Sequence, residues 1–194
     1  MSDQLNLFSF CLYLYVMLNL IDSPPRTIME VYKSLPEGTL AELINGIIYM
    51  SPSPLYKHQK ILRSIARQLE DKILDAGLGE VIVAPFDVYL DEELNAVQPD
   101  IIVVLKANDK ILDRKGHIHG VPDLLIEILS EGNKKHDTIR KKELYEKFGV
   151  KEYWIINPVD SQVIVYALDK VRFVEYGKAN GVIQSKLLNL EFKF

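Results

Sequence analysis

Hydrophobic positions follow a helical spacing in two long segments of the chain. Between residues 56 and 76 they fall three or four positions apart, which predicts a long amphipathic helix that ends near Gly77 and Gly79. Residues 136–149 predict a second helix, with Gly149 as its stop. A short helix is predicted over residues 26–35, just after two prolines. The positions that define the first helix are Ile61, Leu62, Ile65, Leu69, Ile73 and Leu74.

The remaining apolar runs are short and have the composition of β-strands. Asn45-Gly46 separates two such runs within residues 42–50 and predicts a β-hairpin. The order of helices and strands predicts an α/β (α+β) fold, with a mixed central sheet flanked by helices, an N-terminal hairpin and extra C-terminal strands. Further strands are predicted at residues 79–90, 98–106, 120–130, 151–158, 162–168 and 171–177.

One of these strands contains a carboxylate at its centre. Side chains alternate between the faces of a strand, so Leu124, Ile126 and Ile128 would face one core while Glu127 points the other way. An edge strand with a solvated Glu127 is one explanation, but so apolar a run favours a central strand covered on both faces. An unpaired buried carboxylate costs several kcal/mol, so Glu127 would then pair with a base or bind a metal.

Composition and charge narrow the function classes. The chain has 194 residues, of which 48% are hydrophobic and 26% charged, and residues 23–194 suit a single domain. The net charge of -4 provides no global attraction for nucleic acid, so such a contact needs a local basic patch. The single cysteine, Cys11, excludes an internal disulfide and a multi-cysteine zinc site, which fits a cytoplasmic protein.

Residues 1–22 form an N-terminal extension without an assigned function. Its apolar stretch, residues 7–18, is too short to span a bilayer and lacks the basic start of a signal peptide, so no membrane partner is expected. Three interpretations stay open: a docking strand or helix, a short interfacial segment, or upstream sequence translated from a wrongly chosen start. Met17 would be a natural start, and we favour the last interpretation.

A second carboxylate makes a metal site a concrete hypothesis. Asp100 opens the strand before that of Glu127, 27 positions earlier, so the two carboxylates converge if the strands are neighbours. Such a pair repels unless a cation lies between its members. Mg²⁺, or Mn²⁺, accepts one or two carboxylates together with waters and phosphate oxygens, which is the outline of a phosphodiester-hydrolysing site.

A nearby ammonium would complete this chemistry. Leu129 occupies the position two residues after Glu127, where a lysine would be expected on the same strand. The following helix instead offers Lys141, which shares a helix face with Tyr145. The alternative for Lys141 and its basic neighbours is a solvated helix face, and the basic run over residues 134–142 could also supply a local contact surface for DNA.

Several segments together resemble a known family. QPDIIVV, GVPDLLIEILS, HDTIRKKELYEKFGVKEYWIINP and AELINGIIYMSPSP, the last followed by His58, are similar to the Uma-type restriction endonucleases of the PD-(D/E)XK nuclease superfamily. The resemblance covers roughly residues 24–176. It implies a restriction-endonuclease-like core with metal-dependent phosphodiester chemistry, and it places the family's lysine on the helix.

The resemblance also implies roles for individual residues. Asp100 and Glu127 would be metal ligands, with Lys141 as the catalytic ammonium. Asp123 would lie just behind the ligands or bind through water. Glu42 would complete the acidic cluster, unless it is only a solvated hairpin residue.

Three further matches to the family are His58, Tyr145 and residues 152–154. His58 is either a catalytic residue or a packing residue at a helix start, and the second is the commoner use of a lone histidine. Tyr145 would pack beside the lysine or bond a carboxylate, and residues 152–154 would support the last core strand. His117 and His119 could suggest zinc, but no third ligand is near in the sequence, and a glycine-flanked loop is favoured.

The leading functional hypothesis is therefore a metal-dependent DNA endonuclease. A homodimer would let two sites address two strands, although no sequence feature demonstrates one. One alternative is a noncatalytic module on the same fold that binds nucleic acid or protein, because a fold does not fix an activity. Another is a nuclease for RNA or branched DNA, and the sequence does not separate these substrates.

Overall fold

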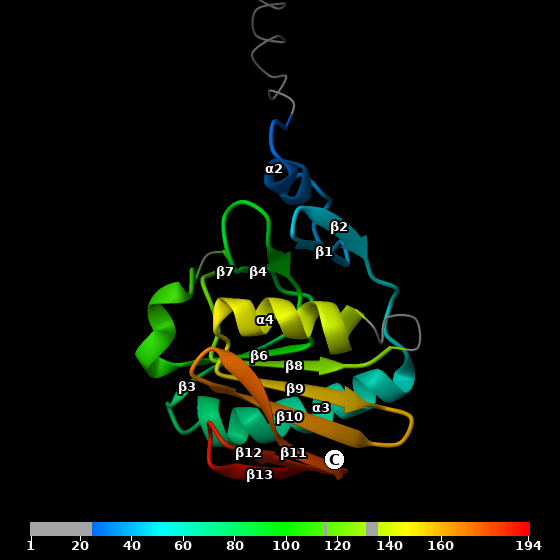
Figure 1. Ribbon diagram of the computed structural model, residues 1–194, viewed down its shortest axis with the longest axis vertical. Helices are drawn as coiled ribbons and strands as arrows, with labels where there is room; N and C mark the ends of the chain where they lie inside the picture. The colour runs from blue at the N-terminus through cyan, green and yellow to red at the C-terminus, as the bar shows by residue number, and fades with distance from the viewer. Residues whose placement is uncertain (1–24, 115, 131–135) are drawn as a thin grey trace, which may run out of the picture.

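Two mixed β-sheets and a few helices build the protein, as the computed structural model shows (Figure 1). It describes residues 25–114, 116–130 and 136–194. The predictions for residues 1–22, and for Lys134 and Lys135 in the basic run, lie outside the described residues.

The larger sheet has six strands in the order β11-β10-β9-β8-β6-β3. Strands β8 and β9 are parallel, and every other neighbouring pair is antiparallel. The predicted mixed central sheet is therefore confirmed. Its strands are β3 (Gly79–Val83), β6 (Ile101–Leu105), β8 (Leu124–Ile128), β9 (Glu152–Asn157), β10 (Gln162–Asp169) and β11 (Arg172–Asn180).

The smaller sheet has five strands in the order β2-β1-β5-β4-β7. Its first two strands form the predicted hairpin, in which Asn45 (φ 49°) and Gly46 (φ 76°) take the left-handed conformation that a two-residue turn requires. The last two strands of the chain, β12 and β13, form a separate antiparallel pair. The bounds are β1 (Ala41–Ile44), β2 (Ile47–Met50), β4 (Val88–Tyr89), β5 (Ala96–Val97), β7 (Ile118–His119), β12 (Val182–Ser185) and β13 (Leu190–Lys193).

Helices cover both faces of the larger sheet. Helix α3 (Tyr56–Leu69) packs on one face and α4 (Lys142–Phe148) on the other, while the short α2 (Ile28–Lys33) lies beside the smaller sheet (Figure 1). The long predicted helix continues past α3 as a π-helical turn, Glu70–Leu74. Another π-helical turn, His136–Lys141, leads into α4. A 3₁₀ helix, Lys106–Ile111, follows β6.

Strand β8 is buried on both of its faces. Leu124, Ile126 and Ile128 belong to the core under α3, whereas Leu125 and Leu129 belong to the core under α4. The predicted central strand is confirmed, and the edge-strand alternative for Glu127 is wrong. The carboxylate therefore lies in an interior where it needs partners.

The prediction of one strand over residues 79–90 is wrong. The chain forms β3 in the larger sheet and β4 in the smaller sheet, with residues 84–87 passing between them. Pro85 lies at this break and has no N–H to continue the ladder of β3. Part of the predicted glycine-flanked loop also differs, because Ile118 and His119 form β7 beside β4.

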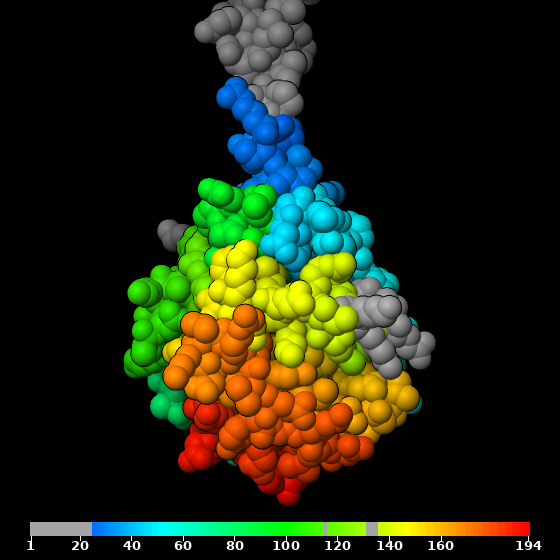
Figure 2. All heavy atoms as spheres, in the orientation of Figure 1, coloured from blue at the N-terminus to red at the C-terminus, as the bar shows by residue number. Residues whose placement is uncertain are grey.

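One hydrophobic core joins the two sheets. It contains Ile44, Val88 and Val97 from the smaller sheet together with Ile102 and Leu125 from the larger one. In the space-filling view the molecule is narrower where the smaller sheet lies, and this part packs directly against α4 and the larger sheet (Figure 2). None of the helices in the described part of the chain is long and apolar enough to cross a membrane.

The end of α4 provides a test of its local stability. Gly149 has φ 83° and caps the helix, and a Cβ there would meet nothing within 4 Å. We expect Gly149→Ala to lower the free energy of unfolding by about 1 kcal/mol, because only the backbone conformation is penalised. Gly177→Ala is the control, since Gly177 has an ordinary φ and equally open space. Equal losses in urea unfolding of the two variants would contradict the prediction.

Candidate active site

A pocket of about 160 Å³ opens where the two sheets meet. The β1–β2 hairpin, the first turn of α3, the end of β8 and the π-helical turn before α4 all contribute to its walls. These elements meet at one end of β8 (Figure 1). The polar lining residues are Glu42, Ser51, His58, Gln59, Gln98, Asp100, Glu127, Ser130, Asp137 and Lys141.

The Lys141 ammonium is the centre of the cluster. Its Nζ lies 2.8 Å from Glu127 Oε1, 2.9 Å from Glu42 Oε1 and 3.6 Å from Asp137 Oδ1. The lysine side chain is only 5% exposed, so the solvated-helix-face alternative is wrong for Lys141. Burial acts to lower the pKa of Lys141, but the three carboxylates raise it well above its usual value, so the ammonium stays charged.

Glu127 is held from two sides. Oε1 accepts hydrogen bonds from Lys141 Nζ and from the Tyr145 hydroxyl, the latter at 3.0 Å, which agrees with the predicted contact of Tyr145. Burial and the negative charges of Asp137, Asp100 and Glu42 raise the pKa of Glu127 well above its usual value, against the effect of Lys141. The cluster thus has more negative charge than the lysine alone balances.

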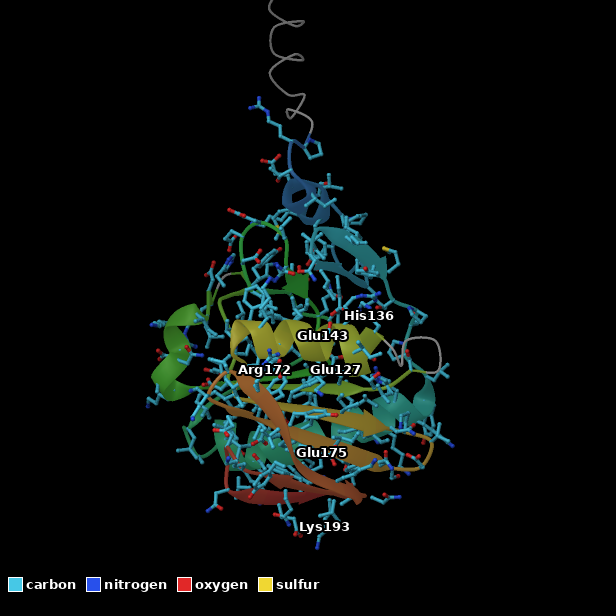
Figure 3. All side chains as sticks on the ribbon, viewed as in Figure 1. Glu127, His136, Glu143, Arg172, Glu175 and Lys193 are labelled. Atoms are coloured by element: carbon cyan, nitrogen blue, oxygen red, sulfur yellow. The ribbon has the colours of Figure 1, made fainter. Side chains whose placement is uncertain are left out.

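Glu42 links the hairpin to this cluster. It accepts the Gln98 backbone N–H at 2.8 Å, and its Oε2 lies 3.0 Å from His136 Nε2. Figure 3 shows His136 at the start of the segment leading into α4, on the side of the hairpin. Burial tends to raise the pKa of Glu42, but Lys141, His136 and Gln98 lower it to about 2. The alternative of a solvated hairpin residue is wrong.

Asp100 is fixed at the mouth of β6. Its Oδ2 accepts the Ile128 backbone N–H at 2.7 Å and lies 3.1 Å from His58 Nε2. The hydrogen bond to Ile128 places Asp100 next to the end of β8, beside Glu127. His58 is buried at the pocket wall, so the sequence-predicted residues Asp100, Glu127, Lys141, Glu42 and His58 all meet here.

Asp123 does not reach the pocket. It is buried at the start of β8, where it pairs with Lys151 Nζ at 2.6 Å and accepts the Leu105 backbone N–H at 2.8 Å. Four residues of strand separate it from Glu127, about 13 Å. The prediction that Asp123 lies just behind Asp100 and Glu127 is therefore wrong. Asp123 and Glu127 point to the same side of the strand, but they lie at opposite ends of it.

Three site residues were not predicted from the sequence: Asp137, His136 and Gln98. Asp137 precedes Lys141 by four positions, a spacing that could have indicated an ion pair on one helical face. His136 and Gln98 carry no such local signal, because they act on Glu42 from distant parts of the chain. Tyr153, in the 152–154 segment, supports Asp137 by donating to its backbone carbonyl at 3.1 Å.

The carboxylates of Asp100 and Glu127 could bind a divalent cation that takes only a few of its ligands from the protein. Within the described residues, no hydrogen bond reaches Asp100 Oδ1 or Glu127 Oε2, and both side chains line the pocket. The same part of the chain holds no group of three His, Cys, Asp or Glu side chains arranged to bind a metal. Two carboxylates with waters and phosphate oxygens match magnesium better than a zinc cage.

Two comparisons with known proteins show the family and the fold of the chain. The model of the Uma2 family, described as "Putative restriction endonuclease", matches residues 29–194. The chain belongs to this family. It also resembles the crystal structure of "a putative nuclease belonging to DUF820" from Anabaena variabilis ATCC 29413, with a TM-score of 0.67 and 21% identity over 87% of this chain and 95% of that one. This likeness shows a shared mixed α/β fold. No curated protein matches the chain.

The buried ammonium provides a test of the cluster. We expect Lys141→Met to lower the free energy of unfolding at pH 7 by about 3–5 kcal/mol, because it leaves buried carboxylates without their counter-ion. The pKa values of Glu127 and Asp137 are already raised, so these groups take up protons as pH falls. The difference in free energy of unfolding between wild type and Lys141→Met should therefore shrink at lower pH. Lys142→Met is the control, because the Lys142 ammonium lies over the Tyr166 ring, 4.2 Å from its centroid, and makes no ion pair with the carboxylates around Lys141 among the described residues. Similar losses in urea unfolding would contradict the assignment.

Glu42 provides a second test, at lower pH. Its pKa is about 2 in the folded protein against 4.5 ordinarily, so its ionised form stabilises the fold above about pH 4.5 and this contribution is lost as pH falls towards 2. We expect wild type to exceed Glu42→Gln in stability by an amount that is constant near neutrality and narrows below pH 4.5. Urea unfolding of both proteins across this range measures it, and a gap that does not change with pH would refute it.

Proposed function

We propose that this protein is a metal-dependent endonuclease that hydrolyses DNA phosphodiester bonds on a restriction-endonuclease-like core. The observation that carries the proposal is the meeting of Asp100 and Glu127 beside a buried lysine in one pocket. Membership of a family described as restriction endonucleases supports it.

Asp100 and Glu127 would hold Mg²⁺ or Mn²⁺ through the carboxylate oxygens that carry no hydrogen bond from the described residues. When bound, the ion supplies Lewis-acid polarisation of a phosphoryl oxygen and lowers the pKa of its water. The protein fixes the two carboxylates. The Ile128 N–H and His58 orient Asp100, while Lys141 and Tyr145 orient Glu127.

Lys141 would place positive charge beside the reacting phosphate. Its three contacts are all with carboxylates, so an entering phosphate oxygen would compete with one of them. The weakest is the 3.6 Å contact with Asp137, which makes that carboxylate the natural one to give way. Charge on the phosphoryl group in the transition state is then stabilised by an ammonium already held in place.

Exposed basic residues flank the pocket and provide a contact surface for DNA. Lys57 and Lys60 lie on the first turns of α3, next to His58, and Arg140 precedes Lys141. The Arg140 guanidinium also lies over the Tyr49 ring, 4.4 Å from its centroid, which holds it near the hairpin. With a net charge of -4, binding should depend on these local contacts and weaken steeply with salt.

Cleavage of supercoiled plasmid and single-stranded DNA with Mg²⁺ or Mn²⁺ tests the proposal. Wild type should nick or cut, and Asp100→Asn and Glu127→Gln should each lose at least about a hundredfold in rate, because either change removes an ionised ligand. Glu143→Gln is the matched control, since Glu143 is exposed on α4 and should leave the rate unchanged (Figure 3).

The outcomes separate the alternatives. Equal rates in all variants would show a contaminating nuclease or a wrong site. No cleavage by wild type, with metal binding that Glu127→Gln abolishes, would refute DNA hydrolysis and favour RNA or branched DNA. No cleavage and no metal binding would favour the noncatalytic module. Conversion of plasmid directly to linear product would support a homodimer acting on both strands.

A further inference from the structure

A second, larger pocket of about 490 Å³ adjoins the candidate active site. Pro85 and Gln98 line both pockets, so the two share part of a wall. A volume of this size suits a nucleotide-sized group better than a lone ion or water. Nothing in the proposed hydrolysis of the phosphodiester bond uses this space.

Aromatic rings form one wall of the second pocket. The His117 ring packs edge-on against Phe86 and Tyr89, with centroid distances of 5.4 and 5.7 Å. Tyr32 packs edge-on against Tyr89 at 6.4 Å. Tyr32 and Tyr89 are buried, and Tyr89 also stacks on His119. The half-buried Phe86 and His117 therefore provide the flat surface on which another ring can pack.

The polar groups of the pocket can recognise a ring edge. Asp87 Oδ1 accepts hydrogen bonds at 2.8 Å from the Tyr32 hydroxyl and from Gln98 Nε2, whereas its Oδ2 has only a 3.5 Å contact with the Tyr89 hydroxyl. Among the described residues, the buried His117 Nδ1 has no hydrogen-bond partner. The pocket thus contains a carboxylate oxygen with spare capacity to accept, together with an imidazole nitrogen that no described residue bonds.

Gln98 connects this pocket to the candidate active site. Its backbone N–H holds Glu42 of the acidic cluster, while its side-chain amide holds Asp87. A ligand seated against Asp87 would therefore be linked through one residue to the groups around Lys141. This is the arrangement expected of a subsite for a neighbouring part of the same substrate.

We propose that the second pocket, lined by Phe86, Asp87, Tyr89, His117 and Tyr32, binds an unpaired nucleobase that carries an exocyclic amino group. The inference rests on the proposed function, because it places the base next to the phosphate that is cut. Adenine, cytosine and guanine can donate a hydrogen to Asp87 from an exocyclic amino group, whereas thymine has no amino group and offers only its single ring N3–H. The base must be unpaired, because in a duplex its faces are stacked and its pairing edge is occupied. The preferred substrate is then single-stranded or locally unpaired DNA.

Binding without cleavage tests this proposal independently of catalysis. Fluorescence anisotropy with labelled oligo-dA, oligo-dC and oligo-dT is measured on wild type in EDTA. We expect dA and dC to bind roughly tenfold more tightly than dT, from stacking plus a hydrogen bond to Asp87. His117→Ala should weaken dA and dC binding roughly tenfold, and Asp87→Asn should abolish their advantage over dT.

Tyr176→Ala is the control, because it removes an aromatic ring that is exposed on β11 and does not line the pocket. It should bind all three oligonucleotides as wild type does. Circular dichroism of each variant establishes that it is folded, and the discrimination ratio is compared within each folded variant.

The results separate this inference from the proposed function. Equal affinity for the three oligonucleotides, or discrimination that survives both Asp87→Asn and His117→Ala, would overturn the base pocket even if wild type cleaves DNA. Discrimination that depends on Asp87 would support the pocket even if wild type cleaves nothing. Duplex binding as tight as single-strand binding would overturn the requirement for an unpaired base.

Discussion

The buried ammonium of Lys141 is the interaction on which the site depends. It joins Glu42 from the smaller sheet, Glu127 from the larger sheet and Asp137 from the turn before α4. Several buried carboxylates repel one another, and a single lysine offsets only part of that repulsion. The remaining negative charge is the reason for proposing that a cation binds in this pocket.

The backbone explains how these groups reach one point. Strand alternation turns Glu127 towards α4, and the next residue on that face, Leu129, is used for core packing. The lysine therefore comes from the segment leading into the helix. There the π-helical turn His136–Lys141 brings His136, Asp137 and Lys141 into the buried interior together. π-Helical turns often occur at functional sites, and here the turn supplies three members of one cluster.

The passage between the two sheets organises the space around the cluster. Residues 84–87 leave the larger sheet and enter the smaller one, so that Pro85 lies at the boundary of both pockets and Asp87 lies in the second. Gln98 spans the same boundary through its backbone and its side chain. A site for phosphate chemistry and a site for a flat ring would thus share one wall, as a nucleotide substrate requires.

The sequence by itself determined the elements and the main site residues. Helical periodicity located α3, the Asn45-Gly46 pair located the hairpin, and a continuous apolar run located β8. An acidic residue inside that run singled out Glu127, the preceding strand added Asp100 and the following helix Lys141, and the family resemblance added Glu42 and His58. Only the tertiary structure decided the division of residues 79–90 between two sheets, the place of Asp123 at the far end of β8, and the contacts of His136 and Gln98 with Glu42. These depend on which distant segments pack together, and local patterns do not record the pairing of residues 56 or 94 positions apart.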